Sequence, residues 1–404
     1  MNKVIIIGGG AAGYFTAINA KEKNPNLEII ILEKGKDVLQ KVRISGGGRC
    51  NVTHACFEPQ ELVKFYPRGE KELLGPFHQF MTGDTFEWFD DRGVPLKIED
   101  DNRVFPEANT SQAIIDCFQK AVDNLGIKVF TNHGVNSVYQ QENKWVVNTK
   151  EAQFEADKLV IAAGSSKKVW ELCGTLDHTI IAPVPSLFTF NIKDKRLTDL
   201  LGISVPNATV SILGTKLEAS GPLLITHWGM SGPAVLKLSA FGARILADQN
   251  YQYNVEVNWL SRPTDKIVNV LLNLKKKEPR KTVALKSPFT EISKRLWERF
   301  VTFSGILPTQ NWADLNNRQL ENLANQLTKG HYNANGRTTF KEEFVTAGGV
   351  DLKEINFKRF ESKQHKNLFL VGEVLNIDAV TGGFNFQNAW TGGYICAKAL
   401  AEKI

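Results

Sequence analysis

The chain lacks several patterns that mark well-known classes of protein. Its 404 residues include no run of 18 apolar residues, the length needed to cross a membrane as a helix. They also include no H-E-x-x-H motif, no paired His/Cys spacing, no Walker A sequence and no G-x-S-x-G elbow. These absences argue against a membrane-spanning protein, a zinc enzyme, a P-loop nucleotidase and an α/β-hydrolase. We expect no metal site and no membrane partner.

Cysteine is scarce and scattered. The five cysteines form no C-x-x-C pair, and their odd number does not suggest a disulfide framework. Reduced thiols in a cytoplasmic protein are the simplest interpretation. The first apolar strand run begins at Lys3, which leaves no room for a signal or transit peptide. We therefore expect a cytoplasmic location.

Charge is only mildly one-sided. The 49 Lys and Arg residues against 43 Asp and Glu residues give a formal net charge of +6. That balance suits anionic ligands but does not require a nucleic acid. Lys275–Lys277, Arg280 and Lys281 form a basic cluster, which we interpret as a solvated helix end. We expect a small-molecule substrate and no nucleic acid partner, and the oligomeric state stays open.

The glycine-rich segments of the chain indicate its fold and its ligand class. A buried-strand run, Lys3–Ile7, leads directly into Gly8-Gly9-Gly10-Ala11-Ala12-Gly13 and a helix predicted over 14–23. This G-x-G-x-x-G pattern is typical of a βαβ unit that binds a dinucleotide. Gly8 permits the tight turn, Gly10 lets the backbone approach a pyrophosphate, and Gly13 allows close packing of the helix on the sheet.

An acidic residue completes this first motif. Glu33 closes the next strand run, 28–32, twenty positions after Gly13. It is placed to accept hydrogen bonds from the ribose hydroxyls of an adenosine, and it disfavours a ribose 2′-phosphate.

A second glycine-rich segment follows within a polar loop predicted over 41–54. Gly46, Gly47 and Gly48 free the backbone, and the segment 41–51 also supplies positive and neutral hydrogen-bonding side chains. We expect this segment to cover the pyrophosphate and to extend towards an isoalloxazine ring.

A third segment lies near the C-terminus. A strand predicted over 367–371 leads into Gly372-Glu373, and Gly382-Gly383 precedes a helix predicted over about 386–403. We expect Glu373 or Asp378 to contact the ribityl chain or a phosphate. The N-terminus of the helix would direct its positive end at the flavin ring.

The order of these segments predicts an α/β fold with a discontinuous Rossmann-like FAD-binding domain, of the kind that two-dinucleotide-binding flavoproteins have. Residues 1–187 form its first part and residues 347–404 its C-terminal part. An α+β domain is inserted over 188–346, β-rich over 188–260 and helical over 261–330.

Within the insertion, the sequence pattern changes and predicts short alternating strands and amphipathic helices. We expect one helix over 233–248, further helices over 265–276, 289–303 and 312–328, and returning strands over 337–340 and 343–346.

In these motifs the chain resembles the BaiN/YhiN-like flavoproteins, which are bacterial NAD(P)/FAD-dependent oxidoreductases. The resemblance is carried, in order, by the segments 44–51, 221–234, 346–350 and 372–388 and extends over essentially the whole chain. It implies non-covalently bound FAD and an inserted domain on the substrate side. It also implies that the following residues contact or surround the cofactor: Gly8, Gly10, Ala12, Gly13, Glu33, Lys34, Lys41, Ser45, Gly46, Gly47, Asn51, Val135, Ala163, Gly164, Gly372, Asp378, Gly383, Phe384 and Asn385.

His227 and Ser231 are the candidate catalytic residues outside the flavin. They lie where an apolar strand passes through His-Trp-Gly into a helix that has Pro233 in its first turn. His227 could exchange a proton opposite the hydride face. A purely structural role, with Ser231 as a helix N-cap, is the alternative.

The leading functional hypothesis is an FAD-dependent oxidoreductase that transfers a hydride between NAD(P)H and an organic substrate. No second strand–GxGxxG–helix unit occurs in the sequence, so NAD(P)H would bind transiently as a co-substrate, or oxygen would be the electron partner of an oxidase. A flavoprotein that modifies RNA, of the tRNA type, and a non-catalytic FAD-binding protein are the other hypotheses.

Overall fold

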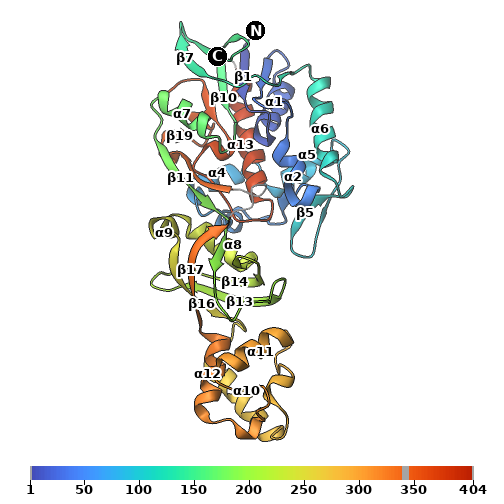
Figure 1. Ribbon diagram of the computed structural model, residues 1–404. Coiled ribbons are helices and arrows are strands. Elements are labelled where there is room, and N and C mark those ends of the chain that lie inside the picture. The colour runs from blue at the N-terminus through green and yellow to red at the C-terminus, as the bar shows by residue number, and fades with distance from the viewer. Residues whose placement is uncertain (1, 339–344, 403–404) are drawn as a thin grey trace. The chain divides into compact units, whose positions relative to one another are not determined.

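The computed structural model describes residues 2–338 and 345–402. The chain divides into two compact units (Figure 1). Unit 1 comprises Met1–Val184 and Val345–Ile404, and unit 2 comprises Pro185–Phe344. In the described part of the chain no helix is long and apolar enough to span a membrane.

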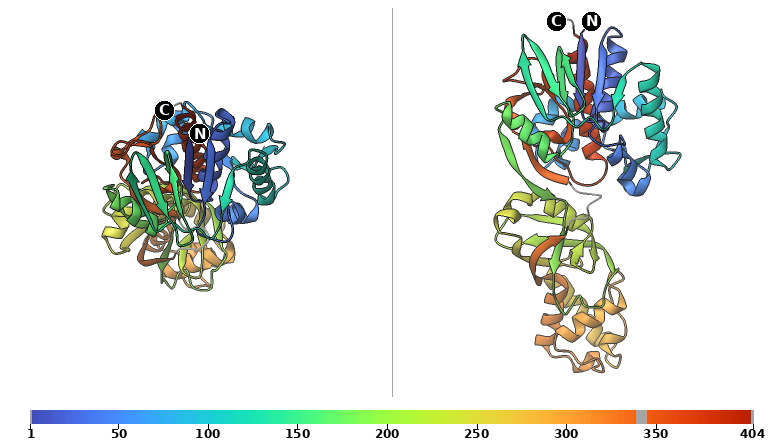
Figure 2. Two further views of the ribbon diagram at one scale, coloured as in Figure 1. Left: turned by 90° about the horizontal axis from the view of Figure 1, so that it is seen from above. Right: turned by 45° about the horizontal axis from the view of Figure 1, so that its top comes forward.

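Unit 1 is built on a seven-stranded sheet in which five consecutive strands, up to one edge, are parallel (Figure 2). The apolar runs predicted at its centre pair side by side and are almost fully buried, as a parallel sheet covered on both faces requires. An antiparallel hairpin closes one edge. In spatial order the strands are β19 (Ile355–Asn356), β20 (Glu361–Ser362), β21 (Leu368–Leu370), β10 (Lys158–Ile161), β1 (Lys3–Ile7), β2 (Glu28–Leu32) and β6 (Lys128–Phe130).

Two helices from opposite ends of the chain pack together beside this sheet. α1 (Ala11–Lys23) contacts α13 (Phe384–Ala401), and Figure 1 shows the blue and red helices adjacent. Small residues permit this approach, since a Cβ at Gly393 would lie 3.0 Å from Thr16 Oγ1. Phe15 packs against Trp88 and Trp390, with ring centroids 4.6 Å and 5.2 Å away. The start and the end of the chain therefore share one core.

Further helices and small sheets complete unit 1. A two-stranded sheet, β11 (Ile180–Ser186) with β18 (Val345–Val350), lies where the chain leaves unit 1 and returns to it. The remaining elements are α2 (Gln40–Gly48), β3 (Thr53–His54), α3 (Pro59–Leu62), η1 (Val63–Phe65), α4 (Glu70–Phe77), α5 (Thr82–Asp90), β4 (Leu96–Ile98), β5 (Arg103–Pro106), α6 (Ser111–Asn124), β7 (Ser137–Gln141), β8 (Lys144–Asn148), β9 (Gln153–Ala156), α7 (Lys167–Thr175), β11 (Ile180–Ser186), β18 (Val345–Val350), η5 (Leu352–Glu354) and η6 (Gly372–Val374).

Unit 2 combines a closed six-stranded barrel with a group of helices. Barrel and helices share one apolar core, in which the Trp259 and Phe300 rings lie 5.5 Å apart. The strands, in barrel order, are β12 (Thr189–Ile192), β15 (Gly229–Ser231), β14 (Glu218–Ile225), β13 (Ser204–Ile212), β16 (Gln252–Asn258) and β17 (Gly330–Thr338). The helical elements are α8 (Pro233–Phe241), α9 (Ala243–Asp248), α10 (Thr264–Lys277), η2 (Val283–Leu285), α11 (Lys294–Phe303), η3 (Trp312–Asp314) and α12 (Asn317–Thr328).

The fold class predicted from the sequence is confirmed, and the local differences have physical causes. The helix expected over 233–248 is two helices that meet at Gly242, where a Cβ would come within 2.7 Å of Leu217 Cδ1. The segment expected to be a loop over 41–54 begins as α2. The strand expected over 337–340 belongs to the longer β17, and its last two residues lie outside the described range, as do 343–344 of the strand expected over 343–346.

Candidate cofactor site

Four parallel strands of unit 1 end at the same edge of the sheet. The chain leaves β1 at Gly8, β2 at Glu33, β10 at Ala162 and β21 at Val371. β2 lies on one side of β1 and the much later β10 on the other, so the strand order reverses at β1. Ligands of open α/β sheets bind outside the carboxyl ends of the strands at such a point.

The three motif glycines at this edge have different surroundings. Gly8 has φ +115°, and a Cβ there would lie 2.6 Å from the Ala162 carbonyl oxygen. A Cβ at Gly13 would collide with the Gly8 carbonyl oxygen. Gly10 has no heavy atom within 4 Å of its Cβ position. Gly8 and Gly13 are therefore required by packing, whereas Gly10 leaves space in front of the backbone, as a bound pyrophosphate requires.

The N-terminus of α1 faces the same space. Gly10 is its N-cap, no side chain caps it, and no acidic residue lies in its first turn. Its first N–H groups are thus available to an anion. Gly372, at the end of β21, has φ +75°, and its Cβ position lies 3.2 Å from the Ala12 Cβ. The first and third motifs meet at this point.

The carboxylate of Glu33, directly after β2, is held by two backbone N–H groups. One carboxylate oxygen accepts a hydrogen bond from the Gly9 N–H at 2.8 Å, and the other accepts one from the Gly35 N–H at 2.8 Å. The backbone therefore fixes the carboxylate, and each oxygen keeps a lone pair for a ribose hydroxyl. His133 N–H donates to the Glu33 carbonyl at 2.8 Å, which brings the segment before Val135 beside Glu33 and Lys34.

The second glycine segment breaks a helix. α2 departs from helical geometry at Ser45, Gly46 and Gly47, and the last two have φ +59° and +67°. A Cβ at Gly46 would lie 2.8 Å from the Phe105 ring, whereas Gly47 and Gly48 have open space around them. Gly46 therefore fits the packing, and Gly47 and Gly48 leave room for a ligand.

Two charged side chains meet at the sheet edge. Lys41, from α2, forms an ion pair with Glu373, which directly follows β21. A Cβ at Gly164, after β10, would lie 3.5 Å from Glu373 Oε2. Ala163 and Gly164 are thus brought next to Gly372 and Glu373. Lys41 supplies a positive charge here, and Glu373 holds that charge in place.

Asn51 connects the second motif to the third. Its buried amide donates to the Thr53 carbonyl at 3.0 Å and accepts from the Gly383 N–H at 3.1 Å. Gly383 has φ +94°, and a Cβ there would collide with Thr53. The neighbouring Cys50 is fully buried, and burial raises the pKa of its thiol to about 12, so Cys50 stays protonated. All five cysteines are unpaired.

The start of α13 is held by aromatic stacking. The buried Phe384 ring packs against both His54, at 4.4 Å, and Phe65, at 4.3 Å between centroids, and these two rings lie 5.7 Å from each other. His54 Nδ1 lies 3.1 Å from the Gly382 carbonyl oxygen. Burial lowers the pKa of His54, so the ring is neutral at neutral pH. Asn385 accepts the Ala379 N–H at 3.0 Å and so shapes the preceding loop.

Asp378 is fully buried and is bound by Arg68 through both carboxylate oxygens. Its carboxylate therefore positions the segment before α13. His54 and Arg68 were not among the residues singled out from the sequence. Arg68 and Asp378 are 310 positions apart, and no local pattern relates them. His54 could have been noticed, because it closes the same segment that begins at Lys41.

The candidate catalytic residues lie in unit 2, whereas all the candidate cofactor residues lie in unit 1. His227 is exposed in the turn between β14 and β15. Ser231 is buried in β15, and its hydroxyl accepts from Thr189 at 2.9 Å. The alternative role of Ser231 as an N-cap is wrong. Gly232 caps α8 with φ +95°, and a Cβ there would come within 2.8 Å of the Pro222 carbonyl.

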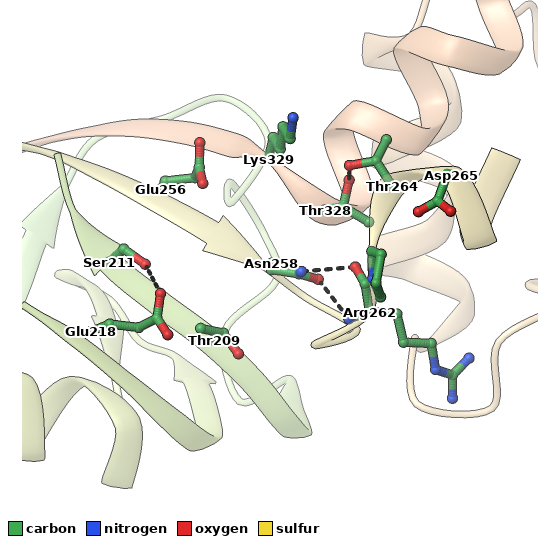
Figure 3. A pocket seen from close by; sticks show the side chains of 11 residues that line it. Thr209, Ser211, Glu218, Glu256, Asn258, Arg262, Thr264, Asp265, Thr328 and Lys329 are labelled. Atoms are coloured by element: carbon green, nitrogen blue, oxygen red, sulfur yellow. Dashed lines mark hydrogen bonds between the residues drawn. The ribbon is translucent and has the colours of Figure 1, made fainter.

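A polar groove of about 430 Å³ lies in unit 2, between the barrel and the first turn of α10 (Figure 3). Glu218, Glu256 and Asp265 contribute carboxylates to its lining, and Arg262 and Lys329 contribute cations. Ser211 donates to Glu218 at 3.0 Å. In the described ranges no group of His, Cys, Asp and Glu side chains has the arrangement of a metal site.

Taken together, a strand, a glycine loop, an uncapped helix and a fixed acidic residue define unit 1 as a dinucleotide-binding Rossmann domain. The chain belongs to the HI0933-like protein Rossmann domain family, whose model matches residues 2–399. The resemblance to BaiN/YhiN-like flavoproteins is confirmed. Family and fold identify an oxidoreductase of the FAD-dependent flavoprotein class.

Three characterised relatives align over nearly their full length. A ribosomal RNA dihydrouridine synthase of Haemophilus influenzae is 27% identical, over 99% of this chain and 98% of the relative. A protein of the same name from Escherichia coli is 28% identical, over 98% and 97%. A 3-dehydro-bile acid delta(4,6)-reductase of Clostridium scindens is 25% identical, over 100% of both chains.

Solved structures support the fold. A 3-ketosteroid-delta4-(5alpha)-dehydrogenase from Rhodococcus jostii superposes with a TM-score of 0.52 at 12% identity, over 100% of this chain and 97% of the other. A 3-ketosteroid delta1-dehydrogenase from Sterolibacterium denitrificans gives 0.52 at 11%, over 99% and 100%. At these identities the likeness concerns the architecture alone.

Proposed function

We propose that this protein is an FAD-dependent reductase that uses NAD(P)H to saturate a carbon–carbon double bond conjugated to a carbonyl. The observation that carries the proposal is the chemistry shared by the names of its relatives. Dihydrouridine is uridine with its C5=C6 bond reduced, and that bond is conjugated to the C4 carbonyl. A delta(4,6)-reductase of a 3-dehydro compound also acts on double bonds conjugated to a ketone.

The substrate that we propose first is a uracil base in ribosomal RNA. Two of the three relatives described above carry that name, and each aligns over at least 97% of its own length. A small conjugated ketone is the second candidate, because the third relative, at 25% identity, is named for such a substrate.

The reaction balances as NAD(P)H plus one proton plus the alkene, giving NAD(P)+ and the saturated product. A hydride adds to the carbon β to the carbonyl, and a proton adds to the α carbon. Bound FAD supplies the two-electron carrier between nicotinamide and substrate. The single G-x-G-x-x-G loop supports transient binding of NAD(P)H, because the sequence offers no second loop of this type.

The residues of this chain would hold the cofactor at both ends. Gly10 and the N-terminus of α1 receive the pyrophosphate, and Lys41 adds a positive charge beside it. Glu33 binds the adenosine ribose. The open Gly47–Gly48 backbone and the start of α13 enclose the flavin end, where the Phe384 stack and the Arg68–Asp378 pair fix the backbone.

His227 is the proposed proton donor to the α carbon. Imidazole exchanges protons readily near neutral pH, and the His227 ring is exposed rather than buried in a structural network. Ser231 remains a weaker candidate, because its hydroxyl is buried and bonded to Thr189. The variant His227→Gln should slow oxidation of the reduced flavin by substrate about 100-fold. Reduction of the flavin by NAD(P)H should not change.

The test separates the two half-reactions. The FAD-loaded protein is mixed anaerobically with NADH or NADPH, and bleaching of the flavin absorbance is followed. Unmodified ribosomal RNA or a conjugated ketosteroid is then added, and recovery of the absorbance is recorded. Mass spectrometry of the digested RNA should show uridine that has gained two hydrogens. Oxidation of the reduced flavin by oxygen alone, with neither substrate active, would contradict the proposal.

A further inference from the structure

Positive charge is concentrated in one part of unit 2. Residues 261–330, the helical segment, contain 13 Lys and Arg residues against 6 Asp and Glu residues, a net charge of +7. The whole chain carries +6, so all the other residues together carry −1. The mild average charge therefore hides a strongly basic segment attached to a nearly neutral remainder. Such segregation is the electrostatic signature of a polyanion-binding surface.

Four of these cations form what we call the basic tip: Lys276, Lys277, Arg280 and Lys286. All four are exposed, and none has a carboxylate within 4 Å among the described residues. Other cations of the segment are neutralised locally, since Arg262 pairs with Glu291 and Lys281 with Glu278. Within the described ranges, Lys266, Arg318 and Lys329 are also exposed without a carboxylate partner, but they lie elsewhere on the helical segment. The basic tip is thus a run of uncompensated cations within eleven consecutive residues.

The backbone beneath the basic tip is fixed by hydrogen bonds. The loop after α10 pairs with the segment 310–313, with Val283 N–H donating to Gln310 at 3.0 Å and Trp312 N–H donating to Lys281 at 3.0 Å. The buried Trp297 indole donates to the Val283 carbonyl at 2.8 Å. The cations therefore project from an ordered surface, which lowers the entropy lost when a partner binds.

Charge is also graded along α10. Its first turn contributes Thr264 and Asp265 to the polar groove of Figure 3, where carboxylates would repel a phosphate. Its last turn carries Lys275, Lys276 and Lys277, about 17 Å further along the helix axis. The helix dipole favours lysines at a C-terminus, but it does not explain Arg280 and Lys286, which lie beyond the helix.

We propose that the basic tip docks the phosphate backbone of RNA and so presents an RNA substrate to the enzyme. This inference rests on the proposed function for its choice of partner. The basic tip is proposed to contribute to affinity and not to chemistry, because none of its four residues is among those proposed to hold the cofactor or to donate a proton. Exposed Leu285 and Leu307, at 62% and 67%, add apolar contact area in the same loops for ribose and base.

The test compares two variants of the FAD-loaded full-length protein with equal charge changes. The first is K276Q/K277Q/R280Q/K286Q. The control is K71Q/K120Q/K150Q/K358Q, which removes four exposed lysines of unit 1. Binding to a ribosomal RNA fragment is measured across a salt series. The first variant should bind tenfold or more weakly at about 0.15 M salt, and its log–log salt slope should fall by about 3. The control should keep the parent slope.

The outcomes distinguish the inference from the function it rests on. Parent protein that binds RNA through the basic tip but reduces no uridine would refute the RNA substrate and leave the docking surface standing. Parent protein that reduces uridine in RNA, with an unchanged KM and salt slope in the first variant, would overturn the docking surface. The docking surface would also be overturned if the parent protein bound phosphatidylserine vesicles but no RNA, and the first variant lost that vesicle binding. Flavin reduction by NAD(P)H at the parent rate shows that the variant is folded.

Discussion

At the scale of single residues, the first glycine motif separates packing from ligand contact. Gly13 faces the Gly8 carbonyl and Gly10 faces open space, although both are glycine positions of the same G-x-G-x-x-G motif. We expect Gly13→Ala to destabilise unit 1 by about 1–3 kcal/mol, because its Cβ would collide with backbone. Chemical denaturation of the FAD-free protein measures this loss.

Gly10→Ala is the matched change on the ligand side. Gly10 has an extended backbone, φ −95° and ψ −170°, that alanine adopts readily. The stability of the FAD-free protein should therefore change by less than about 1 kcal/mol. The affinity for FAD should fall by about tenfold or more, because the new methyl group occupies the space for the pyrophosphate. FAD affinity equal to that of the parent protein would show that Gly10 does not face the cofactor.

His54, which packs against the start of α13, makes this part of unit 1 sensitive to acid. Burial lowers its pKa below the ordinary value of 6.5, so the unfolded chain takes up a proton that the folded chain does not. The stability that His54 contributes is therefore present above that value and is lost as the pH falls below it. His54→Phe keeps a ring against Phe384 but cannot titrate. Between about pH 7 and pH 5, the parent protein should lose more stability than this variant in parallel thermal melts.

At the scale of elements, the buried Arg68–Asp378 pair joins the segment before α4 to the segment before α13. Asp378→Asn leaves a buried guanidinium without its counter-charge and should cost about 3–5 kcal/mol. Release of FAD on dilution should accompany the loss. The double variant R68L/D378L removes both charges and should recover part of the stability in the same denaturation experiment. A double variant less stable than D378N would mean that Arg68 has a second essential contact.

Elements with a strong local signal could be predicted from the sequence. The apolar runs of β1 and β2 and the glycine turn after β1 determine their own conformation, and the structure has them as expected. The close packing of Leu217 against Gly242, where the two helices meet, could not be predicted, because Leu217 is distant in the sequence. Serine is a favourable helix N-cap, so the sequence alone suggests Ser231 for that position. The N-cap of α8 is Gly232 instead, and the close approach of the Pro222 carbonyl requires glycine there.

The site shows the same division between local and long-range information. The glycine positions and Glu33 follow from spacing alone, since the backbone fixes their geometry. The stack of His54, Phe384 and Phe65 joins segments that lie more than 300 residues apart, and hydrophobic periodicity says nothing about such a pairing. The closed barrel was likewise expected only as a β-rich region, because strand order is set by long-range pairing rather than by composition.

At the scale of the whole molecule, each unit has a core of its own. The barrel and the helical segment share one apolar cluster, and Phe300 on α11 packs against Trp259 after β16. Phe300→Ala should therefore cost about 3–5 kcal/mol within unit 2. Hydrogen exchange should show β16 and α11 losing protection together, while β1 and α1 of unit 1 keep theirs. Protection lost only in the helices would mean that barrel and helices unfold separately.

The paired strands β11 and β18 also show how unit 1 accommodates the insertion. They are the outgoing and incoming segments of the insertion, and Gly348 permits their contact, since a Cβ there would lie 2.6 Å from the Pro183 Cα. Because departure and return are adjacent, the Rossmann scaffold closes on itself whatever length of chain lies between them. We therefore expect that changes in the length of unit 2 leave the pairing of β11 with β18, and with it the sheet of unit 1, intact.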